Sequence, residues 1–337
     1  MATMKDVAKL AKVSTSTVSH VFNKTRYVSD EIAQKVMDAV KELNYTPSAL
    51  ARSLKVNHTK TIGMLVTTST NPFYGEVLKG VENRCYQQGY NLILCNTEGD
   101  VERLSASLDI LLQKKVDGLL LMCNDYGLNL FSQHAVVPTV MMDWSSSNFP
   151  CDKIKDNSHA GGYLAGRYLI EKGHREIGCI TGRLNRSTSQ QRLSGLEQAL
   201  SESGLDLNRQ WLVEGDFECE GGYNAFNQLY QQGQLPSALF VFNDMMAMGV
   251  INAASKLGIS IPDDLSLIGY DDVKLASYIT PSLTTIHQPK YRLGEQAIDM
   301  LLNKINQPDS EELMVQLEPT LVERDSVKKV TISSKFK

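Results

Sequence analysis

The chain contains no run of about 18 apolar residues, so a helix that spans a membrane is not expected. Its first residues lack the apolar core of a secretory signal peptide. The six cysteines are scattered without a CxxC pair, which fits free thiols in a reducing compartment. The six histidines show no metal-ligand spacing. Together these absences favour a cytoplasmic protein with no metal or other cofactor.

Three enzyme signatures are also absent: the GxSxG elbow of hydrolases, the Walker phosphate loop and a correctly spaced GxGxxG. An enzyme acting on sugars or nucleotides remains a minor alternative, because Asp143 and Asp271 could form a carboxylate pair. A transport-type binding protein is the other alternative, and the absent signal peptide argues against it.

The net charge of −4 is divided unevenly along the 337 residues. Residues 1–60 hold 10 Lys and Arg against 5 Asp and Glu, a balance of +5, and the remainder has a balance of −9. A chance fluctuation could produce this division. The alternative is that only the basic N-terminal part meets a polyanion.

The first 46 residues predict three short helices. Thr3 and Asp6 form a capping-box pattern in front of a helix over Met4–Lys12. A second helix covers Thr15–Asn23 after a tight turn, and Ser29 opens a third helix whose first turn is acidic. This is the pattern of a helix-turn-helix module. The outer face of the second helix is crowded with Thr, Ser and His, which can reach base edges and phosphates; the alternative is a solvated polar face.

A short stretch, Tyr45–Lys55, separates this head from the rest of the chain. Pro47 suits the first turn of a helix, and Leu50 and Leu54 lie four residues apart. A helix of about two turns is marginal alone in water, so it should form only when other contacts hold it. A conditional helix between two domains is a natural place for a switch.

The segments Met4–Asn23 and Asn44–Leu54 resemble the head and the hinge helix of the lactose-repressor family. The resemblance implies a homodimer on palindromic operator DNA, with paired hinge helices in the minor groove. Leu54 would wedge between base pairs there, although a contact between the two hinge helices is compatible with it. The DNA-binding residues implied are Thr15, Ser16 and His20 on bases, Ser14, Thr17, Ser19, Asn23 and Tyr45 mainly on phosphates, and Ala51, Arg52, Leu54 and Lys55 in the minor groove.

The body, residues 58–337, alternates buried strands with helices, which is typical of a doubly wound α/β fold in two lobes. The expected strands are Thr61–Val66, Leu92–Cys95, Gly118–Met122, Val137–Met142, Ile177–Ile180, Ala238–Phe242, Leu265–Gly269 and Leu283–Ile286. The expected helices lie near 74–88, 101–115, 159–172, 189–203, 220–232, 244–257 and 290–305.

Polar and aromatic residues gather where these strands end, which is where open parallel sheets bind ligands. The candidate ligand-binding residues are Asn71, Phe73, Tyr74, Asp143, Arg192, Phe217, Asn243, Asp271 and Gln288. Amides and carboxylates suit vicinal hydroxyls, and aromatic faces cover C–H surfaces, so the set favours a sugar. Taken singly, Asn243 could be a helix cap and Asp271 a turn residue.

The body is similar to periplasmic ribose-type binding proteins, whose pentose-contact motifs match at these positions. Trp144 departs from them, since those proteins commonly have Arg there. The resemblance therefore implies a repressor that D-ribose induces, controlling a ribose utilisation operon. Arg186 and Thr188 instead resemble the purine-reading residues of another branch of the family, which leaves hypoxanthine or guanine as corepressor the alternative.

The predicted fold is an all-α helix-turn-helix head plus an α/β periplasmic-binding-protein-like body of two doubly wound lobes. The expected domains are a DNA-binding head (1–46), a hinge helix and linker (47–57) and a ligand-binding and dimerisation body (58–337). The C-terminal segment Asp325–Lys337 is short and polar and lacks heptads, so a dimer is favoured over a tetramer.

Overall fold

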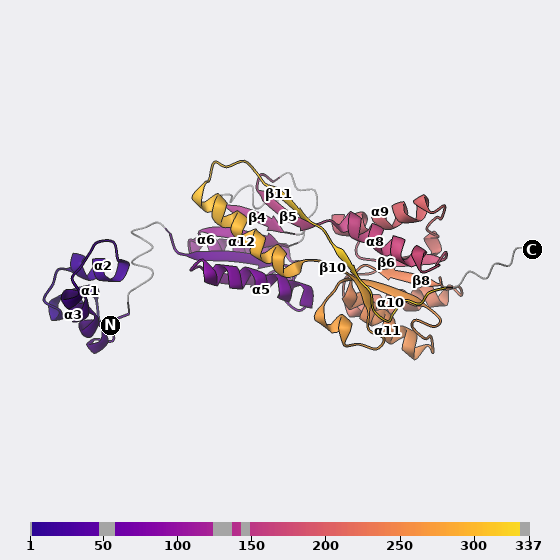
Figure 1. The fold of residues 1–337 in the computed structure, drawn as a ribbon, viewed down its shortest axis with the longest axis horizontal. Coiled ribbons are helices and arrows are strands. Elements are labelled where there is room, and N and C mark those ends of the chain that lie inside the picture. Colours follow the sequence, from indigo (N-terminus) through magenta and orange to yellow (C-terminus); the bar gives the residue numbers. More distant parts are fainter. Residues whose placement is uncertain (1, 47–57, 124–136, 143–148, 331–337) are drawn as a thin grey trace, which may run out of the picture. The chain divides into compact units, whose positions relative to one another are not determined.

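The computed structural model describes residues 2–46, 58–123, 137–142 and 149–330. The chain separates into two compact units, Met1–Thr59 and Lys60–Lys337, and each has its own core (Figure 1). The hinge stretch 47–57 lies outside the described residues, as do Asp143 and Trp144. Among the described residues, no helix is long and apolar enough to cross a membrane.

Residues 2–46 of the first unit form a bundle of three helices, α1 (Met4–Leu10), α2 (Thr15–Asn23) and α3 (Asp30–Glu42). The predicted capping box is confirmed, because Asp6 N donates to Thr3 Oγ1 at 3.4 Å and Thr3 N donates to Asp6 Oδ2 at 2.8 Å. The first helix ends two residues earlier than predicted, since Lys12 adopts a left-handed backbone (φ 54°) that opens the turn. One buried valine from each helix meets in the core: Val7, Val18 and Val36.

The first lobe of the second unit contains a sheet in the order β11-β5-β4-β3-β1-β2. Its strands are β1 (Thr61–Val66), β2 (Asn91–Asn96), β3 (Gly118–Met122), β4 (Thr139–Met142), β5 (Asp152–Asp156) and β11 (Met314–Leu317), and all its pairs are parallel. Helices α5 (Pro72–Gln87) and α12 (Lys290–Asn306) pack against each other and share a core with one face of the sheet. Helix α6 (Val101–Gln113) shares the core of the opposite face.

The second lobe contains a sheet in the order β12-β10-β9-β8-β6-β7. Its strands are β6 (Ile177–Thr181), β7 (Leu212–Glu214), β8 (Ala238–Val241), β9 (Ser266–Asp271), β10 (Thr284–His287) and β12 (Thr320–Val322). Among the described residues of this sheet, the β10–β12 pair is antiparallel and the other pairs are parallel. Figure 1 shows α8 (Ser158–Glu171) and α9 (Ser187–Glu202) on one face, with α10 (Cys219–Gln231) and α11 (Asp244–Lys256) on the other. Two single 3-10 turns, η1 (Arg209–Trp211) and η2 (Lys274–Ser277), complete it.

The chain crosses between the lobes three times: between β5 and α8, between β10 and α12, and between β11 and β12. These crossings leave the carboxyl ends of β1 and of β6, β8 and β9 on either side of one pocket. The two doubly wound lobes and the eight predicted strands are confirmed, with bounds shifted by two residues at most. Strands β5, β7, β11 and β12 were not predicted.

Candidate functional site

The exposed face of α2 carries the small polar side chains that the sequence singled out. Ser14 caps the helix, because its Oγ accepts from Thr17 N at 3.1 Å and lies 2.9 Å from Thr17 Oγ1. Thr15 and Ser16 are exposed on the first turn. The cap orients the first turn so that these two side chains face outward together.

The other predicted DNA-binding residues of the head are partly engaged within it. His20 Nδ1 lies 2.9 Å from Thr25 Oγ1, and Asn23 Nδ2 donates to Ser19 Oγ at 3.2 Å. Tyr45 is half-buried, with its ring centroid 6.1 Å from that of Phe22. Ala51, Arg52, Leu54 and Lys55 lie outside the described residues, so the DNA contacts of the whole set stay predictions.

A pocket with a cavity volume of about 100 Å³ lies between the lobes of the second unit. It brings together eight of the nine predicted ligand-binding residues, and the ninth, Asp143, lies outside the described residues. The lining is Thr67, Thr68, Asn71, Phe73, Tyr74, Arg186, Thr188, Arg192, Asp216, Phe217, Glu218, Asn243, Asp271 and Gln288.

Four residues of the lining were not predicted from the sequence. Thr67 and Thr68 follow β1 directly, so the strand-end rule that selected Asn71 could have found them. Asp216 and Glu218 follow β7, a strand of three residues that carries too little apolar pattern to be recognised. Asp216 and Glu218 form an acidic rim of the pocket, and burial and the nearby Asp216 carboxylate raise the pKa of Glu218, which favours its protonated form.

The two asparagines of the pocket also cap helices. Asn71 Oδ1 accepts from Phe73 N at 2.9 Å at the start of α5. Asn243 Oδ1 accepts from Met246 N at 2.9 Å at the start of α11, and its Nδ2 donates to the carbonyl of Phe217 at 2.8 Å. Asn243 therefore positions Phe217, and its contact with a ligand stays a prediction.

Asp271 is the most buried acid of the lining, at 4% exposed. It ends β9 with a left-handed backbone (φ 106°), as the turn interpretation expected, and its Oδ1 accepts from Gln288 Nε2 at 2.6 Å. Burial raises the pKa of Asp271 to about 6, although the charges of Arg192 and Lys290 oppose the shift. Gln288 Oε1 is buried and has no hydrogen-bond partner within the described part of the chain.

Arg192 extends from α9 into the pocket lining, and two contacts hold its guanidinium group. Its guanidinium carbon lies 3.6 Å from the ring centroid of Tyr270, and its Nη1 donates to the carbonyl of Phe242. Tyr270 in turn donates to Asp156 Oδ2 at 2.6 Å. The fork of Arg192 is therefore fixed by stacking and by a backbone contact, which leaves its orientation toward the pocket well defined.

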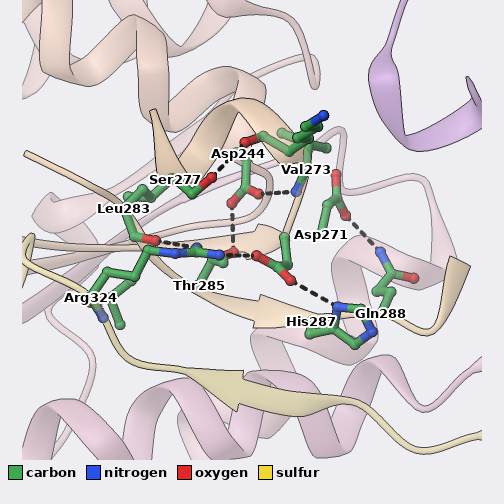
Figure 2. A network of polar contacts seen from close by, with 12 residues as sticks. Asp244, Asp271, Val273, Ser277, Leu283, Thr285, His287, Gln288 and Arg324 are labelled. Atoms are coloured by element: carbon green, nitrogen blue, oxygen red, sulfur yellow. Dashed lines mark hydrogen bonds and ion pairs between the residues drawn. The ribbon is translucent and has the colours of Figure 1, made fainter. Parts of the chain in front are cut away.

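A second layer of polar contacts supports this edge of the sheet (Figure 2). Asp244 accepts from Val273 N at 2.8 Å and from Thr285 Oγ1 at 2.6 Å, and burial raises the pKa of Asp244 well above its usual range. Asp272 lies 2.9 Å from His287 Nδ1 and accepts from Arg324 Nη2 at 2.5 Å. Burial works against ionisation of Asp272, but these two contacts lower its pKa to about 2.

Chemically, the pocket offers hydrogen-bonding groups of both kinds between aromatic walls, which suits a small polar ligand. The guanidinium carbon of Arg186 lies 5.5 Å from the Phe217 ring centroid. Thr188 follows two residues later, in the first turn of α9, and also lines the pocket. These two residues add the donors that the purine alternative requires. Within the described ranges, no group of three or more His, Cys, Asp or Glu is arranged to hold a metal ion.

Comparison with known proteins identifies both parts of the chain. Residues 3–48 match the model of "Bacterial regulatory proteins, lacI family", and residues 167–327 match that of "Periplasmic binding protein-like domain". The chain is 53% identical over 329 residues to the ribose operon repressor of Escherichia coli K12, covering 97% of this chain and all of that protein. It is 54% identical over 332 residues to the HTH-type transcriptional repressor PurR of Edwardsiella ictaluri, covering 97% of each.

Solved structures agree with this result. The lac repressor dimer bound to operator and the anti-inducer ONPF has a TM-score of 0.88 at 28% identity, covering 97% of this chain and 99% of that one. A LacI-family regulator from Enterococcus faecium with bound ribose has a TM-score of 0.71 at 29% identity, covering 80% of this chain and all of that one.

The relatives named above are repressors and span essentially the whole chain, so the enzyme alternative is wrong and the regulator hypothesis is confirmed. The chain belongs to the lacI family of bacterial regulatory proteins, and it is a DNA-binding repressor of transcription.

Proposed function

We propose that this repressor binds D-ribose in the interlobe pocket and that ribose releases it from the operator of a ribose utilisation operon. The observation that carries the proposal is the ring of Asn71, Arg192, Asp271 and Gln288 around one small cavity. Gln288 Oε1 is a buried acceptor that a sugar hydroxyl would satisfy. The ribose operon repressor among the relatives supports the same ligand.

A purine corepressor, hypoxanthine or guanine, is the second candidate. Arg186 and Thr188 line the pocket, and Arg186 lies near the face of Phe217, an arrangement that suits a flat base. The PurR relatives support this candidate at similar identity. The two candidates differ in sign, because an inducer favours the state that leaves DNA and a corepressor favours the state that holds it.

On the DNA side, the head (1–46) reads the operator through Thr15, Ser16 and His20, and Ser14, Thr17, Ser19, Asn23 and Tyr45 hold phosphates. The hinge (47–57) enters the minor groove with Ala51, Arg52, Leu54 and Lys55. The body (58–337) binds the effector and pairs two chains into a dimer. Such a repressor works on the nucleoid in the cytoplasm.

Titration of operator binding against each effector tests the assignment. We expect D-ribose to lower the affinity for operator DNA, measured by fluorescence anisotropy, while hypoxanthine leaves it unchanged. Affinity that rises with hypoxanthine and ignores ribose would replace the first candidate with the second. L-arabinose, a pentose with a different hydroxyl arrangement, serves as the control for nonspecific sugar effects.

The hinge assignment has its own test. Leu54→Ala removes the proposed wedge, so we expect operator affinity to fall by about tenfold or more, because the kink loses the side chain that stabilises it. Effector affinity, measured by calorimetry, should stay within about twofold of the parent, since the pocket is separate from residue 54 in sequence and in role. Equal operator affinity in the variant would remove the wedge from this account.

A further inference from the structure

Lys290 is a buried cation that the proposed function does not use. It is the first residue of α12, directly after the crossing from β10, and its side chain has 0% exposure. Its Nζ donates to the backbone carbonyls of Asp271, at short range, of Asp272 at 2.9 Å and of Gln288 at 3.4 Å. Three carbonyl acceptors match the three donors of an ammonium group.

The three carbonyls belong to the edge that forms the pocket. Asp271 and Gln288 point their side chains into the lining and turn their carbonyls toward Lys290. The left-handed backbones of Asp271 (φ 106°) and Asp272 (φ 56°) are what bring two successive carbonyls onto one cation. Lys290 therefore compensates a backbone arrangement that L-residues rarely adopt.

A carboxylate of the first lobe also lies near the ammonium group of Lys290. Glu76 Oε2 on α5 lies 3.6 Å from Lys290 Nζ, and the Glu76 side chain is 38% exposed. Helix α5 begins at the pocket, where Asn71, Phe73 and Tyr74 form its wall. Lys290 thus joins the effector-lining end of β9 in the second lobe to the effector-lining end of α5 in the first.

We propose that Lys290 is a positioning residue that, anchored by Glu76, couples the effector-binding edge of the second lobe to the first lobe. This inference rests on the proposed function, because it assigns Lys290 to the transmission of effector binding at that same pocket. A ligand that contacts both Asp271 and Asn71 draws together the two ends that Lys290 already connects. Separating the lobes takes the buried ammonium away from the carbonyls of Asp271 and Asp272, which is costly.

Three variants of the full chain test the proposal. Lys290→Met keeps an unbranched side chain and removes its charge. Glu76→Gln removes the charge of the anchor with little change of shape, at a site that is 38% exposed. Lys304→Met is the matched control, since Lys304 lies on the same helix and also donates to a backbone carbonyl, that of Ser310.

The first measurement needs no effector. We expect Lys290→Met to accelerate amide hydrogen exchange across residues 271–292 by about tenfold or more, Glu76→Gln to act in the same direction with a smaller effect, and Lys304→Met to leave this region unchanged. The second measurement is the factor by which ribose or hypoxanthine, whichever the parent protein binds, changes operator affinity. In the first two variants this factor should lie about tenfold closer to one.

Unchanged exchange and an unchanged factor in Glu76→Gln would overturn the proposal, even if Lys290→Met does not fold. A lower melting temperature with an unchanged factor would also overturn it, because Lys290 would then be structural only. If the parent binds neither ribose nor hypoxanthine, the proposed effectors fail while the exchange measurement still decides the role of Lys290.

Discussion

The pKa of Asp271, a residue of the pocket lining, is set by opposing effects. Burial disfavours its ionised form, whereas Arg192, Lys290 and Gln288 favour it, and the balance leaves its pKa at about 6, above the ordinary 3.8. The folded state therefore binds this proton more tightly than the unfolded state does. This group alone makes the fold less stable as the pH rises from about 4 to about 6. Its ionised form, present at neutral pH, is the stronger acceptor for the hydroxyls of the proposed effector.

Effector binding should consequently depend on pH. A sugar that donates to the Asp271 carboxylate selects the ionised form, so affinity should fall as the pH drops from about 7.5 to about 5.5, through the pKa of about 6. Asp271→Asn should lower affinity by about ten- to a hundredfold and flatten this pH profile, as calorimetry can measure. Asp309→Asn, at an exposed site, is the control. A profile that keeps its slope in Asp271→Asn would assign the dependence to another group.

At these residues the sequence supported several interpretations, and more than one is correct. Asn243 is a helix cap, as the plain alternative held, and it also lines the pocket. Asp271 is a turn residue with a left-handed backbone and also the buried acid of the site. Strand-end position predicted a place at the pocket for both residues. The contacts of Lys290 with three carbonyls could not be predicted from local pattern, because they depend on how the chain returns between the lobes.

At the scale of the element, helix α9 is the support for Arg192 and for the Arg186 end of the pocket, and glycine sets its distance from α8. A Cβ on Gly195 would lie 2.1 Å from the carbonyl oxygen of His159, and one on Gly162 would lie 2.1 Å from that of Arg192. Both contacts are with backbone, which cannot rotate away. The two helices can approach this closely only because no side chain stands between them.

Gly195→Ala should therefore push α9 away from α8. We expect the free energy of unfolding to fall by about 1–3 kcal/mol, measured by urea denaturation, and effector affinity to fall with it, since Arg192 is one turn away. Gly75→Ala is the matched control on α5, where a new Cβ meets no atom within 4 Å. That variant should be neutral or more stable by up to about 1 kcal/mol, because Ala is the better helix former. Equal stability of the two variants would contradict this account of the helix contact.

The elements that the sequence did not predict share a physical cause. Strands β7, β11 and β12 are edge strands of three or four residues, too short for a period of two to be recognised. Strand β5 lies inside its sheet, but its sequence Asp-Lys-Ile-Lys-Asp puts charged residues at four of five positions. It is held there because both of its neighbours pair with it in parallel, a long-range effect that local pattern does not contain.

At the scale of the whole molecule, the distribution of charge differs between the part that binds DNA and the part that binds the effector. Residues 1–60 have a balance of +5 and the remainder has −9, so a polyanion is attracted to the head and repelled by most of the body. The proposed effector is neutral and enters a pocket lined by both Arg192 and Asp271, where the charges of Arg192 and of nearby Lys290 favour the ionised form of Asp271. The two binding reactions of one chain should therefore differ in their response to salt.

Operator affinity should fall steeply with salt, because each phosphate that Lys or Arg neutralises releases counterions, with a slope of about −0.9 per phosphate in a plot of log affinity against log salt. Ribose affinity should change by less than about twofold over the same range, since no net charge is transferred. Anisotropy with operator DNA and calorimetry with ribose, in the same buffers from about 50 to about 200 mM salt, give both slopes. A flat operator slope would contradict the neutralisation of phosphates by Lys and Arg of the head, whereas a steep ribose slope would point to a charged effector in place of a neutral sugar.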